Sequence, residues 1–166
     1  MIFYSKFYVS QLKRSFFIAK NENSVCYIDL NDNEKQFIKK IIAYLDEKPV
    51  KKPAELGYET AQIKDYFAGK RKNFDMKIYL KGSSYRLAVW QALAGTEYGE
   101  TVSYSELARL AGNKKAIRAA ATGCAVNPVP IIIPCHRVIS KNGSIGGFGG
   151  GIEMKKKMLE IERDNA

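Results

Sequence analysis

The first thirty residues of the chain show the alternation of apolar and polar stretches that is typical of short β-strands. Three runs rich in aromatic and β-branched side chains, residues 2–9, 16–19 and 25–30, are separated by polar segments such as Asn21-Glu22-Asn23. Runs of this length and composition, bounded by turn-forming residues, predict strands with tight connections. The pattern therefore predicts a small antiparallel sheet in this part of the chain.

The spacing becomes helical after Asn33, whose side chain is suited to cap a helix. Apolar side chains recur at intervals of three and four residues over 34–47, which predicts a helix there. A second helix is indicated by the apolar residues at 63, 66 and 67 and ends at Gly69. The first part of the chain is thus expected to combine a sheet with helices.

A change of pattern follows the second helix. The stretch Gly69–Asn73 is polar and basic, and Met76–Leu80 is a short apolar run. Neither continues the helical spacing, so we place a domain boundary near residue 80. The expected domains are an N-terminal sheet-and-helix domain, 1–80, and a C-terminal domain, 81–166.

Helical signals open and close the second domain. Ser83 or Ser84 is placed to cap a helix that ends at Gly95. A last helix is expected over roughly Glu153–Arg163. The C-terminal domain is therefore predicted to be mainly helical.

Two further helices are expected between them. Ser103 and Glu106 form a capping box, in which each satisfies the other's backbone donor, at the start of a helix that runs through Ala111. After the turn Gly112-Asn113, the pattern predicts a third helix over 114–126. Helix, short turn and helix is the layout of a helix-turn-helix. The fold class is therefore α+β, a small antiparallel sheet with helices followed by a helical domain.

The charge of the chain indicates what class of partner it binds. The chain carries 27 Lys and Arg against 17 Asp and Glu, a formal net charge of +10 at pH 7. Such an excess favours an acidic partner, with nucleic acid first and a membrane surface second. Between residues 101 and 152 there are six basic side chains and a single acidic one, Glu106, so the excess is concentrated there.

Cysteine and histidine usage argues against a metal. Cys26, Cys124 and Cys135 are irregularly spaced, and His136 is the only histidine, so we expect neither a disulfide framework nor a zinc site. No apolar run approaches the roughly 18 residues of a membrane span, and residues 1–20 hold no signal-peptide core. We expect a cytoplasmic protein, associated with the nucleoid, or a nuclear one in a eukaryote.

The third helix of this domain is made of unusually small residues. Alanine or glycine occupies positions 116, 119, 120, 121 and 123, which lets the helix backbone come very close to a neighbour. Tight packing against another helix is one interpretation. Lys114, Lys115 and Arg118 favour the other, in which the helix fits a DNA groove that bulky side chains would not enter.

The segment Asn127–Val138 is the most informative in the chain. Its three prolines fix φ and remove backbone donors, so it is neither an ordinary helix nor a central strand but a rigid path leading to Cys135 and His136. A cysteine beside a histidine is a candidate activated nucleophile. Neighbours on an extended chain point apart, so a bridging water is the expected relay between the thiol and the ring.

Such a site needs a third group that orients the imidazole. In the last helix Met154, Met158 and Ile161 form an apolar stripe, and Glu162 lies on or beside it, four residues after Met158. A carboxylate drawn toward a core needs a partner, and His136 is the candidate. The alternative is an exposed glutamate near a fraying helix end.

A glycine-rich loop, Asn142–Gly151, precedes that helix, with six glycines in ten residues around Phe148. It matches neither the P-loop nor the dinucleotide-binding pattern, so no cofactor is expected. Its backbone could closely approach a flat ligand and read its hydrogen-bonding edge. The alternative is a flexible linker.

The segment Pro134-Cys135-His136-Arg137-Val138, with Asn127-Pro128-Val129-Pro130 before it and Gly146–Gly151 and Glu162 after it, resembles the O6-alkylguanine-DNA alkyltransferases. The resemblance runs from about Tyr66 to Glu162 and is loose over residues 1–60. It implies a variable N-terminal domain and a DNA-binding C-terminal domain with a helix-turn-helix and a Pro-Cys-His-Arg active-site loop.

Carried over by position, the resemblance implies that Cys135 is the alkyl acceptor, His136 the base acting through water, and Glu162 the group that orients it. Tyr104 would donate a proton to the departing guanine. Arg118 would fill the base stack after the target nucleotide is flipped out. The chain's lone histidine also implies that the structural zinc site of some relatives is missing.

The remaining implied residues form a hinge, a pocket and a DNA-binding surface. Asn127 would be the hinge that ties the small-residue helix to the active-site turn. The base pocket would hold Cys124, Val138, Phe148 and Gly149, and DNA would be contacted by Lys114, Lys115, Ala116, Ala119, Ala120 and Thr122 together with Arg118.

The implied activity is direct DNA repair by irreversible, stoichiometric transfer of an alkyl group, such as methyl, from O6-alkylguanine, and O4-alkylthymine, to the protein's own cysteine. The expected partner is double-stranded DNA bound through its minor groove by a monomer. The product is a thioether with no good leaving group, so the protein would be consumed. Flipping is required because the alkylated oxygen lies within the duplex stack.

Two other functions remain as alternatives. A non-repairing lesion sensor resembles these proteins but lacks the acceptor cysteine, whereas Cys135 is present here. A transcription regulator would need base-reading side chains on its recognition helix, and the alanines argue against it.

Overall fold

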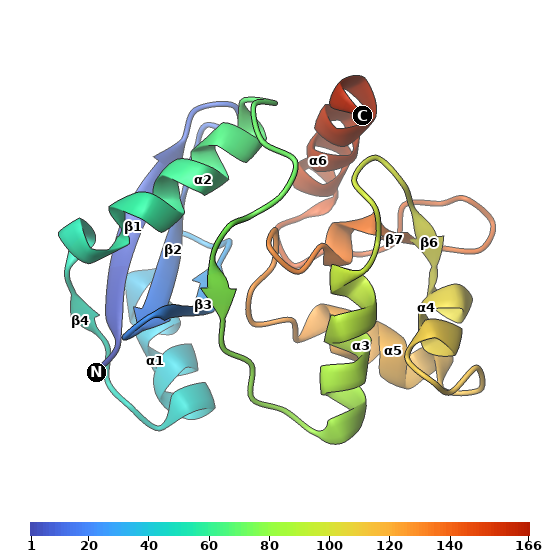
Figure 1. Ribbon diagram of the computed structural model, residues 1–166, viewed down its shortest axis with the longest axis horizontal. Helices are drawn as coiled ribbons and strands as arrows, with labels where there is room; N and C mark the ends of the chain where they lie inside the picture. Colours follow the sequence, from blue (N-terminus) through green and yellow to red (C-terminus); the bar gives the residue numbers. More distant parts are fainter. The chain divides into compact units, whose positions relative to one another are not determined.

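The structure is a computed structural model that describes all residues, 1–166. The chain divides into two compact units, Met1–Lys81 and Gly82–Ala166 (Figure 1). None of the helices is long and apolar enough to cross a membrane. The α+β class predicted from the sequence is confirmed.

The N-terminal unit is built on a five-stranded sheet of order β4-β1-β2-β3-β5. Its centre is an antiparallel meander of β1 (Phe3–Val9), β2 (Arg14–Asn21) and β3 (Ser24–Asp29). Two short edge strands, β4 (Val50–Lys51) and β5 (Lys77–Ile78), pair in parallel with β1 and β3. The sheet is therefore mixed, and the predicted antiparallel arrangement holds only for its centre, because two-residue strands carry no alternation to detect.

Helices cover both faces of this sheet. Phe16 and Phe17 are neighbours on β2 and so point to opposite faces. Phe17 stacks on Phe37 of α1 (Glu34–Leu45) at 4.9 Å between ring centroids. Phe16 lies 6.2 Å from Phe67 of α2 (Gly57–Phe67), which follows the 3₁₀ turn Pro53–Leu56. Burial on both sides explains the unbroken apolar run in the middle of β2.

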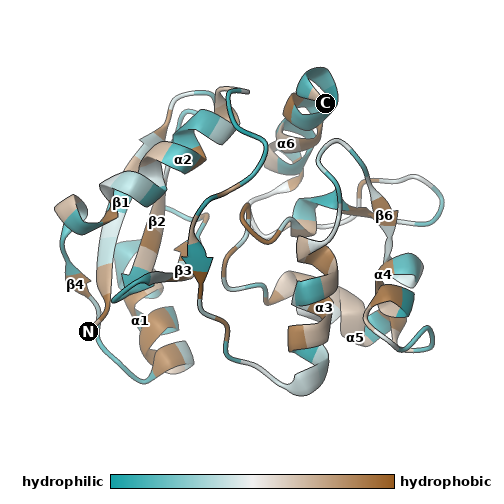
Figure 2. Cartoon of the chain, in the orientation of Figure 1, coloured by the Kyte–Doolittle hydropathy of each residue, from teal (hydrophilic) through white to brown (hydrophobic).

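The C-terminal unit packs three helices together, α3 (Ser84–Ala94), α4 (Tyr104–Leu110) and α5 (Ile117–Ala125). The fourth, α6 (Ile152–Asn165), is mostly hydrophilic with a narrow apolar stripe that buries Met154, Met158 and Ile161 (Figure 2). A parallel pair, β6 (Val102–Ser103) and β7 (Val138–Ile139), links distant segments of this unit.

Two details of the predicted helix-turn-helix are corrected. Ser103 accepts a hydrogen bond from the backbone N–H of Glu106 at 3.1 Å, but the Glu106 carboxylate pairs with Arg109 instead of closing the box. The third helix begins at Ile117 and not at 114, because the Asn113 side chain accepts from the backbone N–H of Lys115 and holds residues 113–116 in a turn.

The small residues of α5 do pack tightly against a neighbouring helix. The indole N–H of Trp90 in α3 donates to the carbonyl of Gly123 at 2.9 Å. A Cβ at Gly123 would lie 2.9 Å from a methyl carbon of Val89, so only glycine allows this approach. Ala119 and Thr122 remain exposed, so the helix also presents a surface of small side chains to solvent.

Candidate active site

The segment between α5 and Cys135 is held by the side chain of Asn127. Its amide N–H₂ donates to the carbonyl of Ile133 at 2.8 Å, and its amide oxygen accepts from the N–H of Val129 at 3.0 Å. Ile131 has φ of +78°, a conformation that a β-branched residue adopts only when its surroundings impose it, at a cost of roughly 1–3 kcal/mol. The segment is thus a fixed, strained path and not a flexible connection.

This path places Cys135 at a cavity of about 220 Å³. Cys135 is 8% exposed and begins a 3₁₀ turn, Cys135–Arg137, where the sequence predicted an extended chain. The cavity is lined by Tyr104, Ala121, Cys124, Ala125, Cys135, Gly147, Phe148 and Gly149. Burial raises the pKa of the Cys135 thiol, and a hydrogen bond with Asn127 and the charge of Lys155 oppose the rise.

Tyr104 reaches the cavity because of the small parallel sheet. β6 ends at Ser103 and β7 begins at Val138, and Val102 pairs with Val138. Because the two strands are parallel, Tyr104 lies beside the end of β7, where the chain continues into the glycine-rich loop. Burial, followed by the nearby thiols of Cys124 and Cys135, raises the pKa of Tyr104, which keeps its phenol protonated at neutral pH.

The glycine-rich loop forms part of the cavity wall. Gly146 has φ of +74°, a conformation that favours glycine, and a Cβ there would lie 3.2 Å from the Tyr104 hydroxyl. Gly147, Phe148 and Gly149 all line the cavity. The sequence left open whether this loop is a linker, and the structure makes it part of the cavity wall.

His136 and Glu162 form a buried pair. His136 Nε2 lies 2.6 Å from Glu162 Oε1, and the two side chains are 0% and 1% exposed. The predicted association of the chain's only imidazole with this carboxylate is therefore present, and the alternative of an exposed glutamate at a fraying end is excluded. Burial lowers the pKa of His136, and the neighbouring charges of Arg137 and Lys155 lower it further against the opposing effect of Glu162.

Arg137 is a member of this cluster that the sequence analysis did not select. It donates from Nε to Glu162 Oε2 at 2.8 Å and from Nη2 to Oε1 at 3.1 Å. Burial alone would raise the pKa of Glu162, but the hydrogen bonds from His136 and Arg137 outweigh it and lower that pKa to about 2. Glu162 is therefore an anion at every physiological pH.

Lys155 was also missed. Its side chain is completely buried and donates to the carbonyl of Val138 at 2.5 Å and of Gly147 at 3.3 Å, which ties the glycine-rich loop to β7. Lys155 and Glu162 are seven residues apart and so share a face of α6. Lys155 lies beside the apolar stripe of α6 just as Glu162 does, so the same helical spacing could have identified it.

One predicted pocket residue, Val138, is not among the residues that line the cavity. It is fully buried within β7 and offers its carbonyl to Lys155. Cys124 does line the cavity, and burial followed by the nearby Cys135 raises its pKa to about 12. The two cavity thiols thus differ in their surroundings.

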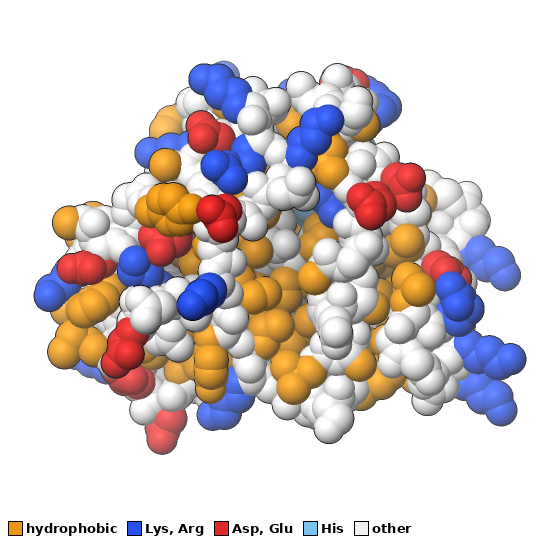
Figure 3. Space-filling view, in the orientation of Figure 1, with side chains coloured by type: hydrophobic (Ala, Val, Ile, Leu, Met, Phe, Trp, Pro, Cys, Tyr) orange, Lys and Arg blue, Asp and Glu red, His pale blue; other side chains and the backbone are white.

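The predicted DNA-binding residues are mostly on the surface. Arg118, Ala119 and Thr122 on α5 are exposed, as are Lys114 and Lys115 in the turn before it. Figure 3 shows Lys and Arg side chains at the edge of this unit where the α4–α5 turn lies. Ala116 is half-buried at the start of α5.

Ala120 is an exception to this placement. Its side chain is 0% exposed and faces the helices of its own unit, so the prediction that it contacts DNA is wrong. The run of small residues gave no means of separating the packed side of α5 from its exposed side.

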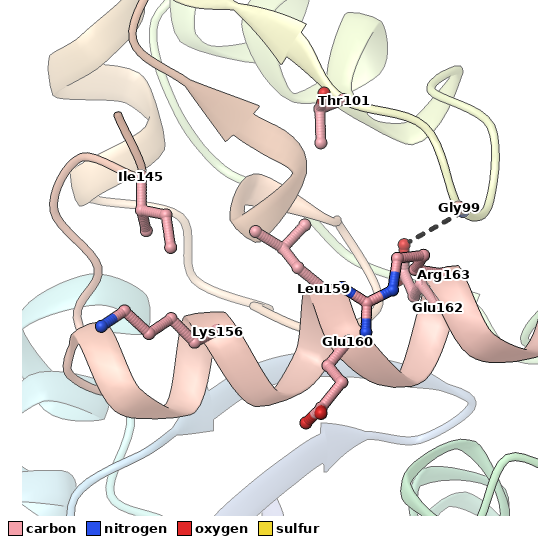
Figure 4. Close-up of a pocket in the computed structure, with 8 residues that line it drawn as sticks. All are labelled: Gly99, Thr101, Ile145, Lys156, Leu159, Glu160, Glu162 and Arg163. Atoms are coloured by element: carbon pink, nitrogen blue, oxygen red, sulfur yellow. Dashed lines mark hydrogen bonds between the residues drawn. The ribbon is translucent and has the colours of Figure 1, made fainter. Parts of the chain in front are cut away.

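A second hollow of about 500 Å³ lies along α6 (Figure 4). It reaches Glu162, whose Oε2 accepts from the backbone N–H of Gly99 at 3.3 Å, but Cys135 is not among its lining residues. Three of its polar side chains, Lys156, Glu160 and Arg163, are exposed residues of α6. No three His, Cys, Asp or Glu side chains of the chain are grouped as a metal site would require.

Comparison with known proteins gives the family. Residues 84–164 match the domain described as "6-O-methylguanine DNA methyltransferase, DNA binding domain". The inducible methylated-DNA–protein-cysteine methyltransferase of Bacillus subtilis is 46% identical over 102 residues, 61% of this chain and 57% of that protein. The constitutive Bacillus subtilis protein of that name is 36% identical over 147 residues, 88% of this chain and 87% of that protein.

Solved structures agree with these relatives. The O6-methylguanine methyltransferase of Mycobacterium tuberculosis is similar with a TM-score of 0.86 and 30% identity, covering 100% of this chain and 95% of that one. A structure of the Mycobacterium tuberculosis protein in complex with DNA matches with a TM-score of 0.83. Some matches are partial, spanning 57% and 65% of the first two relatives' lengths. Similarity over most of the constitutive relative nevertheless shows that the chain belongs to the methylated-DNA–protein-cysteine methyltransferase family.

Proposed function

We propose that the protein repairs DNA by transferring an alkyl group, such as methyl, from O6 of guanine to Cys135, with each molecule acting once. One observation carries the proposal: the Cys135 thiol lines a cavity and is followed directly by His136, which is paired with a permanently ionised Glu162. The names of the relatives and the DNA complex of the Mycobacterium tuberculosis protein support the same activity.

The His136–Glu162 pair determines the direction of proton transfer. Because Glu162 is ionised, it only accepts hydrogen bonds, so His136 Nε2 carries the ring proton and donates it. The other nitrogen, Nδ1, is then the basic one in the neutral ring. A proton leaving the buried Cys135 thiol moves to Nδ1, through a water molecule, and Glu162 stabilises the imidazolium that results.

The transfer itself is an in-line displacement. The Cys135 thiolate attacks the alkyl carbon, the S–C bond forms, and the C–O bond to guanine breaks with its electron pair staying on oxygen. Tyr104, whose raised pKa keeps it protonated, gives a proton to the departing guanine. The product thioether cannot be hydrolysed, so turnover stops after one transfer. O4-alkylthymine presents the same kind of carbon to the thiolate and is a second substrate.

DNA is approached through its minor groove by the exposed side of α5. Ala119 and Thr122 are small enough for close contact, and Lys114 and Lys115, exposed in the turn before α5, would reach phosphates. Arg118 enters the stack in place of the flipped nucleotide. Because one unit supplies the thiol, the base, the cavity and this surface, a monomer suffices.

The test uses a duplex with one O6-methylguanine, a matched duplex with O4-methylthymine, and an unmodified duplex. Intact mass should show one added methyl per protein with either modified duplex and none with the control, and peptide mapping should place it on Cys135. Binding of the modified duplex with no change in protein mass would instead identify a lesion sensor. A duplex that loses methyl while the protein gains none would point to a different reaction.

A further inference from the structure

Arg137 occupies a position that the proposed proton transfer does not yet explain. Its side chain is buried, and its guanidinium makes two hydrogen bonds to Glu162 and a third, from Nη1, to the carbonyl of Thr96 at 2.6 Å. The guanidinium carbon also lies 5.7 Å from the centre of the Tyr98 ring. Each of the three guanidinium nitrogens therefore donates a hydrogen bond, which fixes its orientation.

Two side chains of the cluster, His136 and Arg137, share one carboxylate. Glu162 Oε1 is shared between His136 Nε2 and Arg137 Nη2, while Oε2 accepts from Arg137 Nε and the backbone of Gly99. A buried histidine beside a carboxylate alone tends to hold a proton, because the ion pair stabilises the imidazolium. An imidazolium cannot act as a base. A second, permanent cation on the same carboxylate opposes that protonation.

We propose that Arg137 is a positioning residue that keeps His136 neutral, and so able to accept a proton, by occupying both oxygens of Glu162. The proposal rests on the proposed transfer to Cys135 and adds to it a residue that does not line the cavity. Without Arg137, Glu162 would still accept the hydrogen bond from His136. Its negative charge would then be balanced by no other contacting cation and would stabilise the protonated ring.

The other charged groups around His136 do not replace this effect. Lys155, on the same face of α6 as Glu162, lowers the pKa of His136 less than Arg137 does, and its ammonium is committed to the carbonyls of Val138 and Gly147. Tyr98 carries a raised pKa and is neutral, and the pKa of the Cys135 thiol is also raised. Arg137 is the cation in direct contact with the carboxylate.

The test exploits the fact that His136 is the chain's only histidine. In nitrogen-15 NMR of the imidazole, one signal therefore reports its protonation without assignment. Four proteins are titrated: the unchanged chain, Arg137→Met, Arg137→Lys and Arg163→Met. Arg163 is the matched control because it neighbours Glu162 in sequence, but its guanidinium lies over α6 and pairs with Asp164 (Figure 4).

In the unchanged chain and in Arg163→Met, His136 should stay neutral until well below its ordinary pKa. In Arg137→Met its midpoint should rise by roughly one pH unit or more, as removal of a nearby positive charge does. Arg137→Lys keeps the charge and should restore most of the original midpoint. Methyl transfer by Arg137→Met should then be slowed at neutral pH and recover as pH rises, because His136 loses its extra proton.

A midpoint in Arg137→Met equal to that of the control would overturn the proposal, as would a slowing of transfer that is the same at every pH, the signature of a purely structural role. If Arg137→Met does not fold, Arg137→Gln, which keeps hydrogen-bond donors without charge, takes its place. An unchanged chain that never accepts methyl would refute the proposed function while leaving the NMR result valid.

Discussion

Cys26 and Cys135 are both buried thiols, yet the two units of the protein surround them differently. Cys26 lies in the packed core of the N-terminal unit with Phe37 and Ile41, and its thiol donates to the carbonyl of Ala19 at 3.5 Å. Burial raises its pKa to about 12, and nearby backbone hydrogen bonds offset only part of that rise. Such a thiol is inert toward electrophiles.

Cys135 is also buried, but it lines a cavity and has charged and polar groups around it. Asn127 and Lys155 each favour its thiolate, and the adjacent His136 is supported by Glu162. The comparison shows that burial alone does not make a cysteine a nucleophile. Space for a substrate and a route for the proton distinguish the second site from the first.

The largest expected effect comes from removing each of these two thiols in turn. Cys135→Ser should abolish methyl transfer while DNA binding persists, because a serine hydroxyl is far harder to ionise. Cys26→Ala should transfer one methyl at the normal rate and lose only about 1 kcal/mol of folding stability, as small core deletions do. Intact mass after reaction and chemical denaturation provide the two readouts. Methyl on Cys26 of Cys135→Ser would show that burial without a cavity does not make a thiol inert.

The proton route is the next largest effect. His136→Ala and Glu162→Ala should each slow transfer by roughly 10²–10⁴-fold, the usual contribution of a positioned base. Since the two act as one unit, the double variant should be little slower than the worse single variant. Single-turnover rates provide the measurement. Fully additive losses would show that the pair does not work as a relay.

Arg118 separates the delivery of the base from the chemistry at Cys135. If its guanidinium replaces the flipped nucleotide, Arg118→Ala should slow repair of a saturating duplex by about tenfold or more, since unstacking costs a few kcal/mol. The reaction of Cys135 with free O6-alkylguanine, which needs no flipping, should be nearly unchanged. Equal losses on duplex and free base would assign Arg118 to the fold or the cavity.

Acid stability tests the charge network of the second site. The folded pKa of Glu162, about 2, lies below its ordinary value of 4.5, and that of His136 is also lowered. Both lowered values give stability that is present above the unfolded pKa and lost as pH falls. The contribution of His136 to folding stability should therefore be lost as pH falls below about 6.5. The contribution of Glu162, roughly 3 kcal/mol, should be lost as pH falls from about 4.5 to about 2.

Thermal unfolding across this pH range provides the measurement, with Glu162→Gln as the probe. The variant should lose stability at neutral pH and show a flatter acid profile below pH 4.5. A profile parallel to that of the unchanged chain would mean that Glu162 is not held as an anion by its partners.

The smallest expected effect concerns the exposed lysines. Replacement of Lys114 by Ala should weaken DNA binding about equally for all sequences and lower the slope of log K against log salt by about one. Lys156→Ala, a change on the exposed side of α6, is a control for the lost charge. A minor-groove ligand should compete with the protein, and undiminished binding in its presence would contradict the placement of α5.

Much of this arrangement was predictable from local pattern. Asn33 and Ser83 cap their helices as expected, and the alternation of β1 to β3 identified the meander. The Pro-rich path, the cysteine and the stripe on α6 were each visible as short-range signals. They pointed to a constellation whose members are up to 58 residues apart, from Tyr104 to Glu162.

The rest depended on contacts that local pattern does not contain. Arg137 belongs to the motif that carries the resemblance but had no role assigned to it, and Lys155 looks like an ordinary basic residue in the sequence. Only the fold shows that both are buried against specific acceptors. Ala120 and Ala119 are neighbours of one type, and packing against α3 and α4 decides which is covered. The edge strands β4 and β5 exist because longer strands offer them partners.

The most direct test of the account follows a labelled methyl group from DNA to protein. A duplex whose O6-methylguanine carries a carbon-13 methyl is mixed with equimolar protein, and the methyl NMR signal is recorded before peptide mapping. We expect one equivalent of label to move from oxygen to sulfur, all of it on Cys135 and none on Cys26 or Cys124. Label that stays on the DNA, is released as methanol, or appears on another residue would contradict it.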